Sequence, residues 1–270
     1  MPMSLEIRSP KYERAAITIP SEAAILQKGF NGTVCSNKGD EYTIRNNIID
    51  LLGDKAMDMS WAQSSNHWKV TAALYEDIWR KRSLSILSGE EFPIRKEQEL
   101  LNRWLDPRPA FWYMDIGCST ALYGRLLKKA EPGCEVVSLD FSVQMLEEAR
   151  LKSEAEEANQ YLVRADARSL PFFSATFDGL TMGGTFNELT DPARVLYEAR
   201  RVIKKEGVFF MMHLVKADAW YLRLLQESTE FSGIKFWAIE ESNELFAQTG
   251  FKVADQFCKG IVCFTKLLPA

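Results

Sequence analysis

Hydrophobic and polar positions follow two different periods along the second half of the chain. Five short apolar runs each predict a strand, at 111–116, 135–139, 161–165, 177–182 and 208–214. Between them the apolar residues return at helical spacing, which predicts helices over 121–129, from 143 to about 157, and from Asp191 onward. The last of these begins with aspartate at the N-cap and Pro192 at the first helical position. Strands that alternate with helices of this length predict an α/β fold, a parallel sheet with helices on both faces.

The C-terminal part departs from this alternation. Residues 216–238 are rich in aromatic side chains and are expected to form a helical insertion, and a short helix is expected from Glu241 to about Gln248, ending at Gly250. Strands near 251–257 and 260–266 follow, joined by a tight turn at Lys259-Gly260. The sheet is therefore expected to end in an antiparallel hairpin, unlike an ordinary dinucleotide-binding sheet.

The N-terminal part has a different pattern again. Alternating residues around Lys38-Gly39-Asp40 predict a small β-hairpin lobe that ends in a helical turn, and 57–87 carries helical periodicity. A further helix is expected over 96–105, before a proline-rich turn at 106–109. A second turn is expected at Lys204–Gly207, between the helix that starts at Asp191 and the strand at 208–214. We therefore divide the chain into a lobe, 1–55, and a larger domain, 56–270, with the insertion at 216–238.

Composition narrows the function classes. The chain has 270 residues and a formal net charge of −4, a balance that argues against a nucleic-acid footprint. The N-terminus lacks the apolar core of a signal peptide, and no apolar run is long enough for a membrane span. Five cysteines without a CxxC pair make a disulfide framework unexpected and favour a reduced setting. A cytoplasmic location is expected.

The candidate chemistry begins at a turn between the first predicted strand of the alternating region and its helix. After Asp115, the strand ends in Gly117, Cys118 and Ser119, and the helix begins at once. Such a turn lets a ligand approach the backbone and directs N–H groups toward it. With one glycine only, an empty strand-to-helix turn is an equal alternative.

Two further carboxylates favour the interpretation of this turn as part of a ligand site. Asp140 ends the second strand of the alternating region and Asp166 follows the third. Because the carboxyl ends of parallel strands meet at one edge, these acids and the turn after Asp115 are expected to line one crevice. A carboxylate in the place of Asp140 can accept both hydroxyls of a ribose lying across the turn.

These segments resemble class I S-adenosylmethionine-dependent methyltransferases, particularly the small-molecule, quinone-biosynthesis-like branch. The resemblance covers about 57–266 and implies a Rossmann-like seven-stranded sheet that is parallel except for an antiparallel last strand. It is carried by MDIGCSTA, LDFSVQML, ADARSLPF and the stretch from Phe177 to Gly207. It implies S-adenosylmethionine as cofactor, S-adenosylhomocysteine as product, and a small aromatic or lipidic acceptor.

The resemblance also implies roles for individual residues. Asp115 is expected near the methionine amino group, Asp140 on the ribose, Phe141 over one adenine face and Asp166 by the adenine amino group. The remaining cofactor-site residues that it implies are Tyr75, Gly117, Cys118, Ser119, Met145, Ala167, Met182 and Gly183.

Two features depart from the family pattern. Ser119 and Ala121 stand where the family usually has glycine, and both disfavour a positive φ. The lobe is similar to a zinc ribbon, but zinc needs about four ligands and Cys35 is the only cysteine before Cys118. We therefore expect a degenerate ribbon without a metal.

Methyl transfer needs an aligned acceptor more than elaborate catalytic machinery. His213, Asn187 and Glu188 are the candidate catalytic residues, each balanced against a structural role at a strand end or turn. Tyr75 could equally pack in a core with its helical neighbours. The insertion offers four aromatic side chains that could roof an apolar acceptor pocket or simply cover the sheet: Trp220, Tyr221, Phe231 and Trp237.

Three other functions stay open at this stage. A nicotinamide-dependent oxidoreductase would need a fuller glycine turn and lacks a reason for the C-terminal hairpin. A non-catalytic member could bind a cofactor or a partner protein, and an RNA methyltransferase is suggested by the ribbon-like lobe. The acceptor, the methylated atom and the oligomeric state are open.

Overall fold

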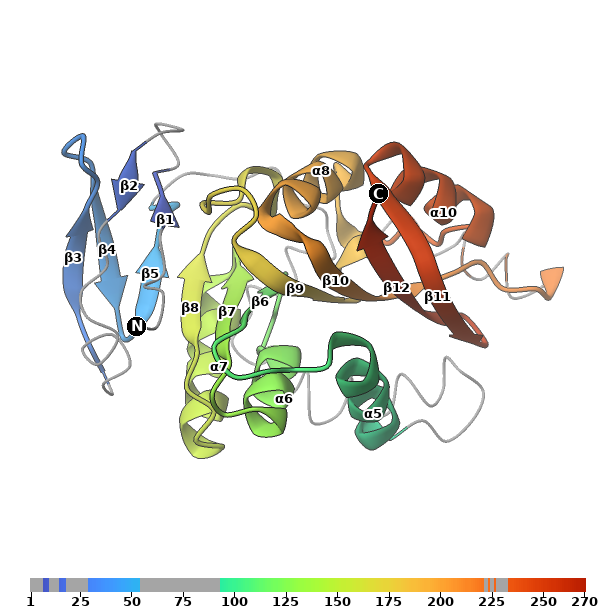
Figure 1. Ribbon diagram of the computed structural model, residues 1–270, viewed down its shortest axis with the longest axis horizontal. Helices are drawn as coiled ribbons and strands as arrows, with labels where there is room; N and C mark the ends of the chain where they lie inside the picture. Colours follow the sequence, from blue (N-terminus) through green and yellow to red (C-terminus); the bar gives the residue numbers. More distant parts are fainter. Residues whose placement is uncertain are drawn as a thin grey trace.

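The computed structural model describes residues 7–9, 15–17, 29–53, 93–220, 223, 226 and 233–270. Within these ranges the fold is α/β, with helices on both faces of one large twisted sheet (Figure 1). The predicted helix at 57–87, including Tyr75, lies outside the described residues.

Seven strands form the predicted sheet in the order β8-β7-β6-β9-β10-β12-β11. Their bounds are β6 Trp112–Ile116, β7 Glu135–Asp140, β8 Tyr161–Arg164, β9 Phe177–Gly183, β10 Ile203–Leu214, β11 Phe251–Lys259 and β12 Val262–Pro269. Pairs from β8 to β10 are parallel, whereas β12 is antiparallel to both β10 and β11. The predicted parallel sheet with an antiparallel last strand is confirmed.

The helices flank this sheet. They are α5 Ile94–Leu105, α6 Leu122–Ala130, α7 Val143–Ala155, α8 Pro192–Val202 and α10 Ile239–Gln248, with short 3₁₀ turns η2 Ala167–Ser169 and η3 Thr185–Glu188. The side chain of Asp191 caps α8 by accepting from Arg194 N at 3.0 Å, as the sequence predicts. In Figure 1, α8 and α10 lie on one face, and α5, α6 and α7 lie on the other.

Alternating side chains of the strands build a core on each face. Phe209 and Met211 of β10 join Val195 of α8 and Phe246 of α10, whereas Phe210 packs on the α5 side. This two-residue period is the one expected for a sheet covered on both faces. By the same alternation, His213 lies on the face of β10 that carries Phe209 and Met211.

The N-terminal lobe is joined to the sheet. Its hairpin of β3 Gly32–Cys35 and β4 Glu41–Arg45 is confirmed, but the segment expected as a helical turn is the strand β5 Ile48–Asp50. β5 pairs with β4 and, in parallel, with β8, so that the sheet runs to ten strands. Two consecutive β-branched residues, Ile48 and Ile49, are buried there, which favours a strand over a helix. A separate two-stranded ladder joins β1 Ile7–Arg8 to β2 Ala16–Ile17.

Two further expectations fail. Cys258 and Cys263 form a disulfide across the β11–β12 hairpin, where they are register partners with a Cα–Cα distance of 4.1 Å. The expected absence of disulfides is therefore wrong at this pair, because antiparallel pairing brings the two residues together. The predicted turn at 204–207 belongs instead to β10, whose pairing with β9 shifts register between Ile203 and Val208.

The described residues include no helix that is long and apolar enough to cross a membrane.

Candidate functional site

The turn from β6 into α6 has the left-handed backbone of a ligand loop. Gly117, Ser119 and Ala121 all have positive φ, at 63°, 51° and 57°. At Gly117, an added Cβ would lie 2.4 Å from Thr185 Cγ2, and Thr185 Oγ1 donates to the Gly117 carbonyl at 2.9 Å. The loop thus keeps the shape that glycines normally give it, although two of its residues disfavour that backbone.

Asp140 joins this loop to the next strand end. Its carboxylate accepts from Ser119 N at 2.8 Å and from Ser142 N at 2.9 Å. Ser142 in turn caps α7 by accepting from Met145 N, and Ser119 Oγ lies 3.4 Å from Met145 Sδ. These contacts bring Ser119, Asp140 and Met145 together, as predicted, at the carboxyl edge of β6 and β7.

Cys118 lies beside them in a buried position, where its N–H donates to Leu139 O at 3.0 Å. Burial raises the pKa of the Cys118 thiol well above its usual range. A thiol held neutral in this way is a poor nucleophile at neutral pH. Cys118 therefore shapes the loop through its backbone.

Asp115 lies below the loop within the sheet. It is buried, and Thr181 Oγ1 of the adjacent strand donates to Asp115 Oδ1 at 2.7 Å. Met182, also buried, and half-buried Gly183 follow on β9. Asp115 thus lies on the strand between β7, which ends in Asp140, and β9.

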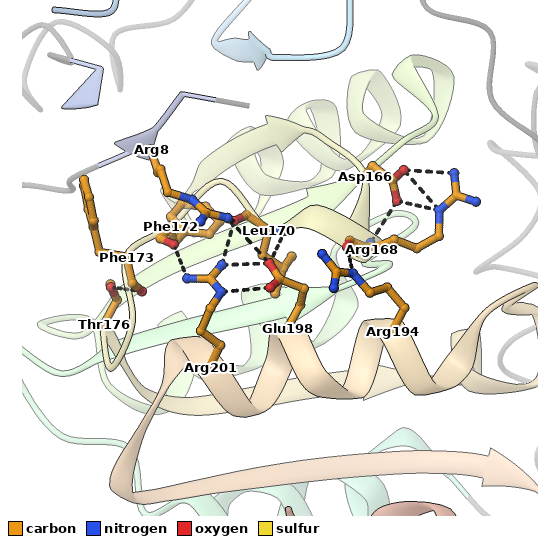
Figure 2. Close-up of polar contacts among 10 residues, drawn as sticks. All are labelled: Arg8, Asp166, Arg168, Leu170, Phe172, Phe173, Thr176, Arg194, Glu198 and Arg201. Atoms are coloured by element: carbon orange, nitrogen blue, oxygen red, sulfur yellow. Dashed lines mark hydrogen bonds and ion pairs between the residues drawn. The ribbon is translucent and has the colours of Figure 1, made fainter. Parts of the chain in front are cut away.

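Asp166 lies just after β8, where Arg168 of the same turn binds its carboxylate (Figure 2). Both carboxylate oxygens accept from the Arg168 guanidinium at 2.9–3.1 Å, and Oδ1 also accepts from Arg168 N. Ala167 is the first residue of η2, and Arg194 Nε donates to Arg168 O at 3.0 Å. Sequence reasoning did not single out Arg168, because an arginine two positions after an acid is common on surfaces.

Glu188, one of the predicted catalytic residues, interacts electrostatically with Asp140 at the end of β7. It ends η3 in a half-buried position. Burial, together with the negative charge of Asp140, raises the pKa of Glu188 to about 7. A carboxyl group whose pKa lies near neutrality can take or release a proton at physiological pH.

Asn187 has its side chain bonded to the backbone. Its amide donates to Leu214 O at 2.8 Å and to Lys235 O at 2.6 Å, and its oxygen accepts from Leu214 N at 2.7 Å. These bonds tie η3 to the end of β10 and to the segment before α10. The structure therefore gives the Asn187 side chain a positioning role.

His213 lies on the face of β10 that α10 covers. The fully buried ring meets Phe186 and Phe246 edge-on, at centroid distances of 5.6 and 5.9 Å. Neither ring nitrogen has a hydrogen-bond partner among the described residues, and burial lowers the pKa of His213 to about 4. Its neutral imidazole is thus part of an aromatic core.

The aromatic roof predicted over the acceptor divides into three parts. Trp237 is buried and stacks on Phe186 at 4.8 Å between centroids, whereas Trp220 is 73% exposed. Tyr221 and Phe231 lie outside the described residues. Within the described ranges, no three cysteine, histidine or acidic residues gather in a way that could hold a metal ion.

The fold is Rossmann-like and of the nucleoside-binding kind. Two features define it: antiparallel β12 lies between β10 and β11, and the loop after β6 donates a backbone hydrogen bond to Asp140. Residues 114–211 match the family model described as a methyltransferase domain. The chain is 31% identical, over 92% of its length and 70% of the relative's, to a chloroplastic protein of Arabidopsis thaliana named as an uncharacterized methyltransferase. The chain belongs to the class I S-adenosylmethionine-dependent methyltransferases.

Two further comparisons agree with this assignment. A ubiquinone/menaquinone biosynthesis C-methyltransferase of Ruegeria sp. is 40% identical over 48% of this chain and 53% of its own length. The chain thus spans about half the length of the quinone-methyltransferase relatives that it matches. The crystal structure of a SAM-dependent methyltransferase from Aquifex aeolicus shares the fold, with a TM-score of 0.52 and 19% identity over 64% of this chain and 90% of that one.

S-adenosylmethionine is the cofactor of this family, and the chain offers a site of suitable chemistry. A Cβ at Gly117 would be too close to Thr185, so position 117 has room only for a glycine. The Asp140 carboxylate is oriented by two N–H groups at the adjoining strand end. The predicted methyltransferase class and cofactor are thus confirmed, and the nicotinamide alternative is wrong.

Proposed function

We propose that this chain transfers the methyl group of S-adenosylmethionine to a carbon atom of a quinone-like ring. The observation that supports cofactor binding most directly is the hydrogen bond from Ser119 N to the Asp140 carboxylate. This bond holds the left-handed loop against the end of β7. The acceptor class is suggested by the Ruegeria relative, whose name states C-methylation in ubiquinone and menaquinone biosynthesis.

The cofactor supplies a methyl group that is already activated on a positively charged sulfur. We propose that Asp140 accepts the ribose hydroxyls, that Phe141 covers one adenine face and that Asp166, oriented by Arg168, accepts from the adenine amino group. Asp115, oriented by Thr181, would accept from the methionine ammonium group. The other proposed contacts come from Tyr75, Gly117, Cys118, Ser119, Met145, Ala167, Met182 and Gly183.

Carbon methylation requires an electron-rich ring carbon, which forms when a ring hydroxyl of the reduced, quinol form of the acceptor loses its proton. The methylated ring carbon then releases its own hydrogen as a proton, which restores the aromatic ring and the hydroxyl. We propose Glu188 as the group that takes this proton, because its raised pKa lies near neutrality and its charge interacts with Asp140 in the crevice. His213 is a poorer candidate, since its lowered pKa and aromatic surroundings keep it neutral and enclosed. Asn187 would support Glu188 by fixing η3.

Titration calorimetry with S-adenosylhomocysteine tests the cofactor proposal. We expect micromolar binding that falls at least tenfold in Asp140→Asn, because one charged acceptor for the ribose is lost. Asp106→Asn is the matched control, since this exposed aspartate follows α5 and precedes β6, at the opposite edge of the sheet from Asp140. Absence of binding by the wild-type chain would contradict the proposal.

Transfer of an isotope-labelled methyl group to demethylated naphthoquinols tests the acceptor. We expect a product heavier by about 14 Da in the unlabelled reaction, with a methylated ring carbon. We expect Glu188→Gln to lower kcat about 100-fold or more and to remove a pH limb near 7. His213→Phe is expected to keep kcat within a few-fold, and the reverse pattern would assign the base to His213.

The cytoplasmic location predicted from the sequence stays a prediction. The Arabidopsis relative is described as chloroplastic, so we propose that localisation be tested with a fluorescent fusion to the full chain.

A further inference from the structure

Arg164, at the end of β8, connects the N-terminal lobe to the proposed adenosine site. Its Nη1 donates to Asp50 Oδ2 at 2.9 Å and to Gly53 O at 2.8 Å, both in the segment that ends β5. Its Nε donates in the other direction, to Phe141 O at 3.0 Å. One guanidinium group therefore bonds to the lobe and to the residue that follows Asp140.

The backbone places Arg164 between two acids. In the ladders of the sheet it is the register partner of Asp140 on β7 and of Asp50 on β5. Its carbonyl also accepts from Leu51 N at 3.0 Å. Both partners of the ion pair are largely buried, with side-chain exposures of 20% and 17%, so solvent screens it less than a surface pair.

Asp50 is itself oriented by the turn that follows it. Its Oδ1 accepts from Leu52 N at 3.0 Å and from Gly53 N at 2.9 Å, which leaves Oδ2 directed to Arg164. The planar fork of arginine can bond in two directions at once, which a lysine ammonium on its flexible stem does not match. The lobe thus orients the Arg164 guanidinium group, which also donates to the Phe141 carbonyl.

We propose that Arg164 is a positioning residue through which the N-terminal lobe raises affinity for the adenosine half of the cofactor. Fixing the Phe141 carbonyl restricts the 140–142 segment, so that the Asp140 carboxylate and the Phe141 ring are held ready for ribose and adenine. Because coupling between two sites is reciprocal, cofactor binding also stabilises the lobe. This inference rests on the proposed cofactor site.

Calorimetry with S-adenosylhomocysteine on Arg164→Gln, Asp50→Asn and the double variant tests the coupling. We expect each single change to weaken binding about tenfold, and the double variant to be little weaker than either one, since both act through one connection. Arg164→Lys is expected to recover only part of the affinity. Arg45→Gln is the matched control, because this exposed lobe arginine lines the same groove as Arg164.

Hydrogen exchange gives a second readout that a purely structural arginine would not change. In the wild-type chain, S-adenosylhomocysteine is expected to slow exchange at Ile48–Asp50, and Asp50→Asn is expected to lose this protection. Variants that melt at lower temperature but bind with wild-type affinity would overturn the inference. Asp50→Asn keeps the Arg164 side chain but removes the charge that orients it, and so remains informative if Arg164→Gln does not fold. No binding by the wild-type chain would instead contradict the proposed function.

Discussion

Gly117 is the residue at which backbone geometry limits the site most sharply. Gly117→Ala would force an alanine into φ 63° and place its Cβ 2.4 Å from Thr185 Cγ2. The left-handed backbone costs about 1–2 kcal/mol, and displacement of Thr185 adds the loss of its bond to Gly117 O. We expect a total loss of about 3 kcal/mol in the free energy of unfolding, with weaker S-adenosylhomocysteine binding, measured by urea denaturation and calorimetry.

Gly184→Ala is the control for this prediction. Gly184 also has a left-handed backbone, with φ 89°, but the nearest atom to an added Cβ is Met212 Cε at an ordinary 3.6 Å. Only the backbone penalty is expected there. Equal losses in the two variants would show that contact with Thr185 does not matter.

Glu188 predicts a pH dependence of stability with a definite sign. Its carboxyl pKa rises from 4.5 to about 7 on folding, through burial and the charge of Asp140. The folded state therefore keeps a proton that the unfolded state loses between pH 4.5 and 7, and stability rises as pH falls through this range. Glu188→Gln is expected to be more stable than the wild type above pH 7, by at most about 3 kcal/mol.

The measurement is a set of denaturation curves for both proteins from pH 4.5 to 8. Their difference isolates Glu188 from His213, whose lowered pKa removes stability as pH falls from 6.5 toward 4. A difference that does not change with pH would contradict the raised pKa of Glu188.

Single residues could be placed from the sequence where one strand end carries one acid. Asp140 and Asp166 could be placed because parallel strands bring their ends to one edge. The contacts that orient them could not, since Ser119 N and the Arg168 fork depend on the exact direction of side chains. His213 shows the same limit, because a one-position change along β10 moves a side chain from one face to the other.

Asn187 joins three elements, and its amide is expected to matter more for stability than for chemistry. Asn187→Asp keeps the acceptor for Leu214 N but sets a carboxylate against the carbonyls of Leu214 and Lys235. We expect a loss of about 3 kcal/mol or more at pH 7, which shrinks on acidification as the carboxyl becomes protonated and can donate. Urea denaturation at pH 5 and 7 measures both effects.

Asn159→Asp, at an exposed position, is the control and is expected to change stability little. A full loss of turnover in Asn187→Asp at unchanged stability would instead favour a direct role in methyl transfer.

The elements of the alternating region follow the sequence closely because each has a strong local period. Helix α8, with its aspartate cap and proline, begins at the predicted residue. β5 was missed because its two isoleucines form a strand only when β8 pairs with them. The bond between Asp50 and Arg164 joins residues 114 positions apart, a distance over which local periodicity carries no information.

In the whole molecule, the described part of the N-terminal segment is hydrogen-bonded to the larger domain at two sites, besides its apolar contacts in the core. One is the β5–β8 ladder, and the other is an ion cluster around Glu198 of α8 (Figure 2). Glu198 accepts from Leu170 N at 2.8 Å and from Arg201 Nη2 at 2.7 Å, and Arg8 Nη2 lies 3.7 Å away. Arg8 Nη2 also donates to Leu170 O at 3.1 Å, and Arg8 N donates to Pro171 O at 2.9 Å.

The two attachments predict different effects for two variants in this cluster. Arg8→Gln removes a largely buried charge that links β1 to Glu198 but leaves Glu198 paired with Arg201, so we expect a global loss of about 2 kcal/mol. Glu198→Ala leaves Leu170 N without its acceptor and takes the carboxylate from Arg201, which keeps its bonds to the carbonyls of Leu170 and Phe172, for a loss of about 3 kcal/mol. Hydrogen exchange is expected to quicken at 7–9 and 15–17 in Arg8→Gln while 48–50 stays protected by β8. Equal quickening of both segments would mean that the lobe opens as a unit and that its two attachments are not independent.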